Sequence, residues 1–115
     1  MSEYKGILNP VTKNREGYYD YSNAGAMIDF NQTRSHTATQ DCLFSFYAIG
    51  QGSLNANITI NNKTVIDAVY MYSAPSGFLI SFPFCYPLKA GDVIKLNVNT
   101  GQITELRGHE IPFTS

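Results

Sequence analysis

From residue 27 onward, apolar and polar residues alternate with a period of two, with interruptions, and this is the period of a β-strand. The segment 42–50 (CLFSFYAIG) places side chains alternately on two faces: Cys42, Phe44, Phe46 and Ala48 on one, and Leu43, Ser45, Tyr47 and Ile49 on the other. The segment 56–61 (ANITIN) alternates most regularly, and we expect Asn57, Thr59 and Asn61 to point outward. Both segments are predicted strands.

Six other segments complete a set of about eight short predicted strands: 27–31, 64–72, 78–86, 92–99, 103–108 and 110–115. Turn residues separate them at 61–63 (NNK), 73–77 (SAPSG) and 100–102 (TGQ). No window supports an amphipathic helix, because Gly, Pro and β-branched residues interrupt each one. The pattern predicts an all-β antiparallel sandwich or barrel.

The first 26 residues differ from the rest of the chain. They hold four glycines or prolines (Gly6, Pro10, Gly17 and Gly25), charged residues of both signs and the tyrosine-rich stretch GYYDY, without a sustained period. We therefore expect an extended arm over 1–26, followed by one β-sandwich domain over 27–115.

Two predicted strands, 42–50 and 78–86, are apolar on both faces. A strand of an antiparallel sandwich normally keeps one face in water. Two apolar faces in so small a domain indicate that one of them meets another subunit. We therefore expect a homo-oligomer, and a trimer is one common way for β-sandwiches to cover such a face.

Composition and charge narrow the possible partners. The net charge of −1 and the scattered Lys and Arg residues form no basic stripe, so a nucleic-acid partner is not expected. No apolar run is long enough for a membrane span, and the first 19 residues lack the apolar core of a signal peptide. We expect a chain that stays in the cytoplasm or leaves by a route other than secretion.

The two cysteines, Cys42 and Cys85, are too few for a disulfide scaffold or a zinc site. Each lies among aromatic residues in a predicted strand, which favours two buried, reduced thiols. A bridge between them stays open if their strands are neighbours.

No motif for catalysis, metal binding or a cofactor stands out, and we expect a non-enzymatic protein with no cofactor. His36 and His109 lack metal-ligand spacing, and no Gly-x-Ser-x-Gly elbow is present. A glycosidase needs two carboxylates about 5 to 10 Å apart. Any two acids could meet in space, but those from residue 20 onward are isolated along the chain: Asp20, Asp29, Asp41, Asp67, Asp92, Glu105 and Glu110.

The segment Lys89-Ala90-Gly91-Asp92 has two interpretations. A loop that binds a phosphate or carboxylate normally has several glycines or is followed by the N-terminus of a helix, and neither is present here. As a corner, Gly91 suits the third position of a type II turn, and Asp92 can accept a hydrogen bond from a turn amide. The structural corner is favoured.

Four residues are the candidate ligand-binding set: Tyr70 and Tyr72 at the end of one strand, and Asn61 and Asn62 at the tip of the opposite hairpin. Aromatic rings stack on sugar rings and amides bond sugar hydroxyls, so this mixture could bind a glycan. Packing within an oligomer is the alternative, because tyrosine is also enriched at protein interfaces.

Three stretches carry a family resemblance: Thr37–Asp41 as an entry, Ile60–Asn62 as a hairpin, and the corner Pro87–Ile94. Together they resemble tail-fibre tip or receptor-binding proteins of bacteriophages and prophages, and the Gly-Asp corner is similar to one in C1q and tumour-necrosis-factor-like jelly rolls. The resemblance implies a jelly-roll head that trimerises and contacts host cell-surface polysaccharide. It also implies location in a virion, beside other virion proteins.

Two alternatives stay open. One is a structural virion protein of the baseplate or capsid, whose surfaces bind only other virion proteins. The other is a small glycan hydrolase.

Overall fold

The computed structural model describes residues 19–71 and 80–113. The predicted turn at 73–77 and the candidate residue Tyr72 lie outside these ranges. The described elements are a short 3-10 turn and six strands: η1 (Tyr21–Asn23), β1 (Ile28–Asp29), β2 (Ser35–Thr37), β3 (Cys42–Ile60), β4 (Lys63–Met71), β5 (Ile80–Leu88) and β6 (Val93–Pro112). The all-β prediction is confirmed. No helix among these residues has the length and apolar character needed to cross a bilayer.

Strands β3 and β6 are unusually long, and they pair antiparallel from end to end. Strand β3 joins two predicted segments and β6 joins three, so the described residues form six strands rather than about eight. The ladder continues because a glycine with positive φ lies at each bend: Gly52 (φ 77°) in β3 and Gly101 (φ 81°) in β6. The predicted turn at 100–102 is therefore a bend within β6 and does not reverse the chain.

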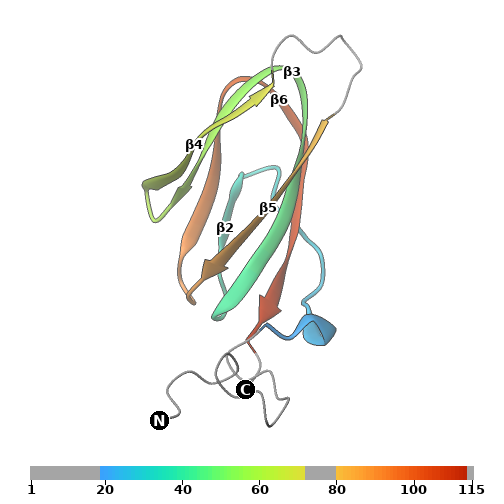
Figure 1. Cartoon of the computed structure of the whole chain (residues 1–115), viewed down its shortest axis with the longest axis vertical. Helices are drawn as coiled ribbons and strands as arrows, with labels where there is room; N and C mark the ends of the chain where they lie inside the picture. The colour runs from blue at the N-terminus through green and yellow to red at the C-terminus, as the bar shows by residue number, and fades with distance from the viewer. Residues whose placement is uncertain (1–18, 72–79, 114–115) are drawn as a thin grey trace, which may run out of the picture.

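The bent pair β3–β6 belongs to both layers of a sandwich (Figure 1). In one layer, the first half of β3 lies between β5 and the second half of β6, which also pairs with β1. In the other, the second half of β3 lies between β4 and the first half of β6, which also pairs with β2. The two layers share one core of buried residues.

The core follows the predicted alternation. Phe44 and Phe46 from the first half of β3 are buried, as are Leu54 and Ile58 from its second half. The Phe44 and Phe46 rings stack with centroids 5.2 Å apart. A side chain at Gly108, on β6 opposite Phe46, would bring its Cβ within 2.6 Å of the Phe46 Cβ, so glycine is required there.

The other face of the first half of β3 is less apolar than its own sequence indicates. Tyr47 lies opposite Arg107 of β6, and its hydroxyl donates to the Glu105 carboxylate over 3.0 Å. Arg107 Nη1 lies 3.1 Å from Glu105 Oε1. Charged residues of β6 therefore contact this face of β3. The expectation that β3 is apolar on both faces is corrected: its second face is partly polar.

Strand β5 is an edge strand, because it pairs only with β3 within the described residues. It carries Pro83 and Pro87, opposite Tyr47 and Leu43. Proline has no N–H and is tolerated in a sheet where its nitrogen faces away from the ladder. Both prolines therefore remove donors from the free edge of β5.

The residues just before β1 lie along β6. The Asp20 amide donates to the Pro112 carbonyl over 2.7 Å, and the Gly25 amide donates to the Glu110 carbonyl over 2.8 Å. The rings of Tyr19 and Phe113 stack with centroids 4.9 Å apart. Within the predicted arm 1–26, residues 19–26 are thus joined to the sandwich, and residues 1–18 lie outside the described ranges.

Candidate functional site

In the hairpin between β3 and β4, the side chain of the first asparagine, Asn61, makes hydrogen bonds within the fold. Asn61 and Asn62 both have positive φ (51° and 64°), as a two-residue type I′ turn requires. The Asn61 side chain donates from Nδ2 to Asp92 Oδ1 and accepts from the Val93 amide, each over 2.9 Å. The predicted ligand residue Asn61 therefore joins the hairpin to the Lys89–Asp92 corner.

The corner itself is the predicted type II turn. The Asp92 amide donates to the Lys89 carbonyl over 2.9 Å, and Gly91 has φ 93°. The Asp92 carboxylate accepts from the Lys89 amide over 2.8 Å. Hydrogen bonds from Asn61 and from the Lys89 amide lower the pKa of Asp92. The carboxylate therefore stays charged and holds the turn closed.

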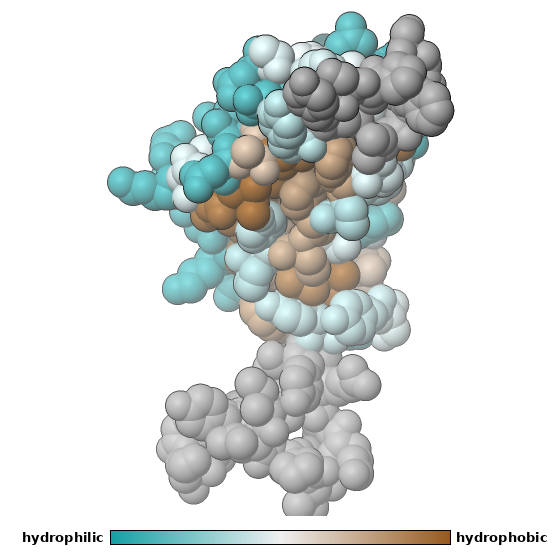
Figure 2. All heavy atoms as spheres, turned by 45° about the horizontal axis from the view of Figure 1, so that its top comes forward, coloured by the Kyte–Doolittle hydropathy of each residue, from teal (hydrophilic) through white to brown (hydrophobic). Residues whose placement is uncertain are grey.

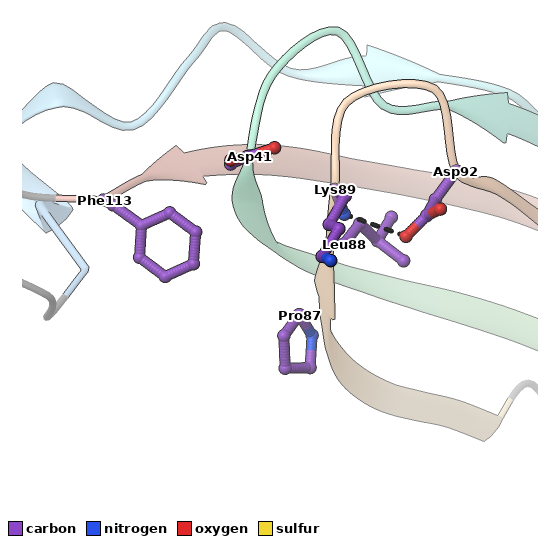
Figure 3. Close-up of a pocket in the computed structure, with 6 residues that line it drawn as sticks. All are labelled: Asp41, Pro87, Leu88, Lys89, Asp92 and Phe113. Carbon is purple, nitrogen blue, oxygen red and sulfur yellow. Dashed lines mark hydrogen bonds between the residues drawn. The ribbon is translucent and has the colours of Figure 1, made fainter.

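A pocket of about 320 Å³ lies between this corner and Phe113 (Figure 3). It brings two carboxylates, Asp41 and Asp92, to one cavity. Asp41 Oδ1 accepts from the Ala90 amide over 2.9 Å, so both acids hold the backbone of the same turn. A glycosidase acid needs a raised pKa, and that of Asp92 is lowered. The geometry fits a structural role for this pair.

A third acid, Glu110, is buried. Glu110 is 3% exposed, and its carboxylate accepts hydrogen bonds from the Thr39 amide and hydroxyl. The His36 ring lies against it and stacks on Phe44 with centroids 4.5 Å apart. No group of three or more His, Cys, Asp or Glu side chains suited to a metal ion occurs in the described ranges.

Both cysteines are free thiols, and their environments differ. Cys42 is fully buried, and burial raises the pKa of its thiol to about 11. Cys85 is exposed, so the prediction of two buried thiols is right for Cys42 and wrong for Cys85. Strand β5 neighbours β3, but Cys85 lies opposite Ser45 and Cys42 lies opposite Leu88. The pairing register thus places neither cysteine opposite the other.

The outer surface of the β4–β3–β6 layer carries a set of amides and hydroxyls. We call this surface the amide face, and it consists of Asn55, Asn57, Thr59, Thr64, Tyr70, Lys95, Asn97 and Thr100. Alternation along β3 puts Asn55, Asn57 and Thr59 on one side because the neighbouring residues Leu54, Ala56 and Ile58 fill the core. The resulting surface is polar and includes the charged Lys95, and the exposed Asp67 lies nearby on β4.

Two asparagines at the centre of the amide face hold one another. Asn57 lies opposite Asn97 on β6, and Asn97 Nδ2 donates to Asn57 Oδ1 over 2.9 Å. The same Nδ2 lies 3.4 Å from the Thr59 hydroxyl. These contacts occupy both hydrogens of Asn97 Nδ2. Asn97 Oδ1 and Asn57 Nδ2 make no other hydrogen bond among the residues described, and both asparagines are half-buried.

The predicted ligand residue Tyr70 lies on the amide face. It pairs with Asn55 and is 59% exposed. The predicted partners Asn61 and Asn62 lie beyond the opposite end of β4, so the structure does not bring them to Tyr70. Sequence reasoning missed Asn55, Asn57 and Asn97 as site residues. Their outward alternation with Thr59 was the signal that could have found them.

An apolar groove opens on the other side of β4, between the edge strands β4 and β5. Its volume is about 360 Å³, and the residues that line it are Ile66, Ala68, Val69, Tyr70, Phe82, Pro83 and Phe84, so Tyr70 lies at the border between the groove and the amide face. Figure 2 shows apolar residues gathered on this face of the molecule. The exposed apolar surface therefore lies between the layers, not on the back of β3.

Comparison of the chain with protein-family models and with curated protein sequences finds no match. Among solved structures, the chain is similar to rabbit GITRL, with a TM-score of 0.51 and 15% identity over 71% of this chain and 74% of that one. It is also similar to a family 35 carbohydrate-binding module from Clostridium thermocellum, with a TM-score of 0.45 and 14% identity over 89% of this chain and 82% of that one. The fold is thus an antiparallel β-sandwich of jelly-roll type, as expected.

Proposed function

We propose that this chain is a non-enzymatic carbohydrate-binding protein and that the amide face is its binding surface. The observation that carries the proposal is the hydrogen-bonded Asn57–Asn97 pair, which lies on the same layer as Tyr70, a residue that is 59% exposed. Sugars offer hydroxyls that both donate and accept, and apolar ring faces that pack on aromatic rings. A sheet face made mostly of amides and hydroxyls suits such a ligand.

The test is retention on immobilised polysaccharides: cellulose, mannan, galactan and purified bacterial cell wall. We expect the wild-type chain to be retained on at least one, and Asn97→Ala and Tyr70→Ala to lower retention at least tenfold. Asn62→Gly is the matched control, because its turn lies at the far end of β4 and glycine accepts the positive φ. Absence of retention on the whole panel would overturn the proposal.

We further propose that the protein works on a bacteriophage or prophage particle, as a tail-fibre tip that contacts host cell-surface polysaccharide. The support is the resemblance of the hairpin Ile60–Asn62 and the corner Pro87–Ile94 to such tip proteins. Mass spectrometry of purified particles tests this, with the chain expected among the particle proteins. Particles that contain it, combined with no glycan retention, would favour the structural accessory role.

Assembly into a homo-oligomer, with a trimer as the expected form, belongs to the same proposal. The apolar groove between β4 and β5 supports it, because exposed apolar surface favours association. Several copies would also raise a weak affinity for a repetitive glycan by avidity. Light scattering should give a mass three times the 12.8 kDa of one chain, and Ile66→Lys should give monomers where Val65→Lys does not. A wild-type monomer at micromolar concentration contradicts this.

A glycan hydrolase is the second candidate, because Asp41 and Asp92 line one pocket. An assay for reducing ends on the same four polysaccharides decides it. Release of sugar that Asp41→Asn abolishes, while the variant keeps its thermal stability, would replace the binding proposal with an enzyme. We expect no release.

A further inference from the structure

The pocket beside the Lys89–Asp92 corner differs from the amide face in its chemistry and shares no residue with it. It is lined by three apolar residues, two acids and one base: Pro87, Leu88, Phe113, Asp41, Asp92 and Lys89. Its volume of about 320 Å³ lies at the lower end of the range for small-molecule pockets, about 300–1,000 Å³. The pocket, which we call the corner pocket, therefore has room for one small ligand.

Two charged groups of the corner pocket have no partner within the described part of the chain. Asp92 is not one of them, because its Oδ1 accepts from Asn61 and its Oδ2 accepts from the Lys89 amide. Asp41 uses only Oδ1, which accepts from the Ala90 amide, and its Oδ2 makes no hydrogen bond to another described residue. The Lys89 ammonium likewise forms no ion pair there. A carboxylate oxygen and an ammonium group of the same pocket are thus left to solvent or to a ligand.

Phe113 adds an aromatic ring to the same pocket. Figure 3 shows this ring on one side of the pocket, with Lys89 and Asp92 on the other. The ring stacks on Tyr19 with centroids 4.9 Å apart, and Phe113 is still 39% exposed. Because Tyr19 already orders the Phe113 ring, a ligand that packs on it pays little for ordering this side chain.

The mixed charge of the corner pocket favours a neutral ligand over an ion. An anion would be repelled by Asp41 and Asp92, and a cation would be repelled by Lys89. A neutral ligand that suits all three kinds of lining residue needs a hydroxyl to donate to a carboxylate, a hydroxyl to accept from an ammonium, and an apolar face to pack on an aromatic ring. A sugar ring has all three features.

We infer that the corner pocket binds a single sugar residue and is a second carbohydrate site, separate from the amide face. In this site Asp41 Oδ2 accepts a hydrogen bond from one hydroxyl, the Lys89 ammonium donates to another, and Phe113 packs on the ring. The inference goes beyond the proposed function, because it rests on residues that the amide face does not use.

Titration of the ¹⁵N-labelled chain with glucose, galactose, mannose and N-acetylglucosamine at millimolar concentrations tests the inference by NMR. At least one sugar should shift the backbone amides of Leu88, Lys89 and Phe113 saturably. The dissociation constant should rise at least fivefold in Lys89→Met and in Asp41→Asn, where Oδ1 can still accept from the Ala90 amide. The matched controls are Lys63→Met and Asp67→Asn, which alter exposed residues of β4 outside the pocket and should bind like the wild type.

The inference is overturned if no sugar causes saturable shifts, if the shifts lie outside the corner pocket, or if Lys89→Met and Asp41→Asn both keep the wild-type affinity. Saturable binding of the zwitterion alanine at these amides, in place of any sugar, would also overturn it. Failure here is distinguishable from failure of the proposed function. Asn97→Ala should leave the monosaccharide shifts unchanged, whereas retention on polysaccharide that Asn97→Ala lowers supports the amide face whether or not the corner pocket binds.

Discussion

The Nε2 atom of His36 lies 2.6 Å from the Oε2 atom of Glu110, although 74 positions separate the two residues in the chain. Thr39 adds its amide and its hydroxyl to the same carboxylate. All of these donors come from β2 and the loop that follows it, so Glu110 holds that segment against β6. The same loop meets the corner, where the Gly91 amide donates to the Ala38 carbonyl over 2.8 Å.

This contact makes stability depend on pH. Burial alone would raise the pKa of Glu110, but hydrogen bonds from Thr39 and His36 outweigh burial and lower it. A carboxyl with a lowered pKa in the folded state stabilises the fold above its unfolded pKa of about 4.3, and the stabilisation is lost as the pH falls through the folded value. Urea unfolding between pH 7 and pH 3 should show stability falling below about pH 4.3.

Glu110→Gln separates this contribution from the other acids. Asp20 and Asp92 also have lowered pKa values, but they remain in the variant. At pH 7 the variant should unfold more easily by about 2 kcal/mol, because hydrogen bonds to a buried charge are lost. Its unfolding free energy should also change less between pH 5 and pH 3. A variant that follows the wild-type pH curve would show that Glu110 is not the responsible group.

The two thiols should react at very different rates. Cys85 is exposed, whereas Cys42 is fully buried with a thiol pKa raised to about 11 by burial. Burial also raises the pKa of the Cys85 thiol, so the difference in rate comes from exposure: dithionitrobenzoate at pH 8 should modify one thiol in the folded protein and two in urea. Cys85→Ser should leave no fast-reacting thiol. Rapid modification of both thiols in the native protein would contradict the described burial.

The bend in β6 requires a glycine for two reasons that a matched pair of variants separates. Gly101 has φ 81°, and a Cβ there would lie 2.6 Å from the Leu54 Cα. Gly52 has φ 77°, but its Cβ would meet nothing within 4 Å. Gly52→Ala should therefore cost about 1 kcal/mol for the backbone conformation alone, and Gly101→Ala clearly more. Thermal unfolding measures the difference in stability between the two variants. Equal losses of stability would mean that the Gly101 and Leu54 backbones do not approach each other this closely.

The hairpin offers another matched pair. Asn61→Gly keeps the positive φ but removes the bonds to Asp92 and the Val93 amide, so we expect a loss of about 1 kcal/mol of stability. Asn62→Gly keeps the same backbone freedom and should change stability little. Asn61→Gly should also keep full glycan retention, because the amide face lies elsewhere. Loss of retention in this variant, with its fold intact, would return Asn61 to the binding site.

Local chemistry allowed much of the fold to be predicted. The alternation in 42–50 and 56–61 identified both faces of β3, the paired asparagines identified the hairpin, and Gly91 identified the corner. Each of these depends on neighbours within a few residues. The oligomer, the virion and residues 1–18 stay predictions.

Long-range register could not be predicted in the same way. Gly52 and Gly101 look like the ends of strands in sequence, yet each bends a strand that continues, because β3 and β6 pair on both sides of the bend. The same limit applies to the candidate ligand-binding residues, which stay a prediction. Tyr70 was identified by its chemistry, but its true neighbour Asn55 follows from the pairing of β3 with β4, which alternation alone does not fix.

The prolines of β5 affect how the protein behaves at high local concentration. An open sheet edge normally recruits the backbone of the next molecule and can grow into a fibril. With Pro83 and Pro87 in a nine-residue strand, β5 offers no continuous row of donors to such a neighbour. Backbone pairing of neighbouring copies through β5 is therefore disfavoured, and contacts at this edge depend on side chains.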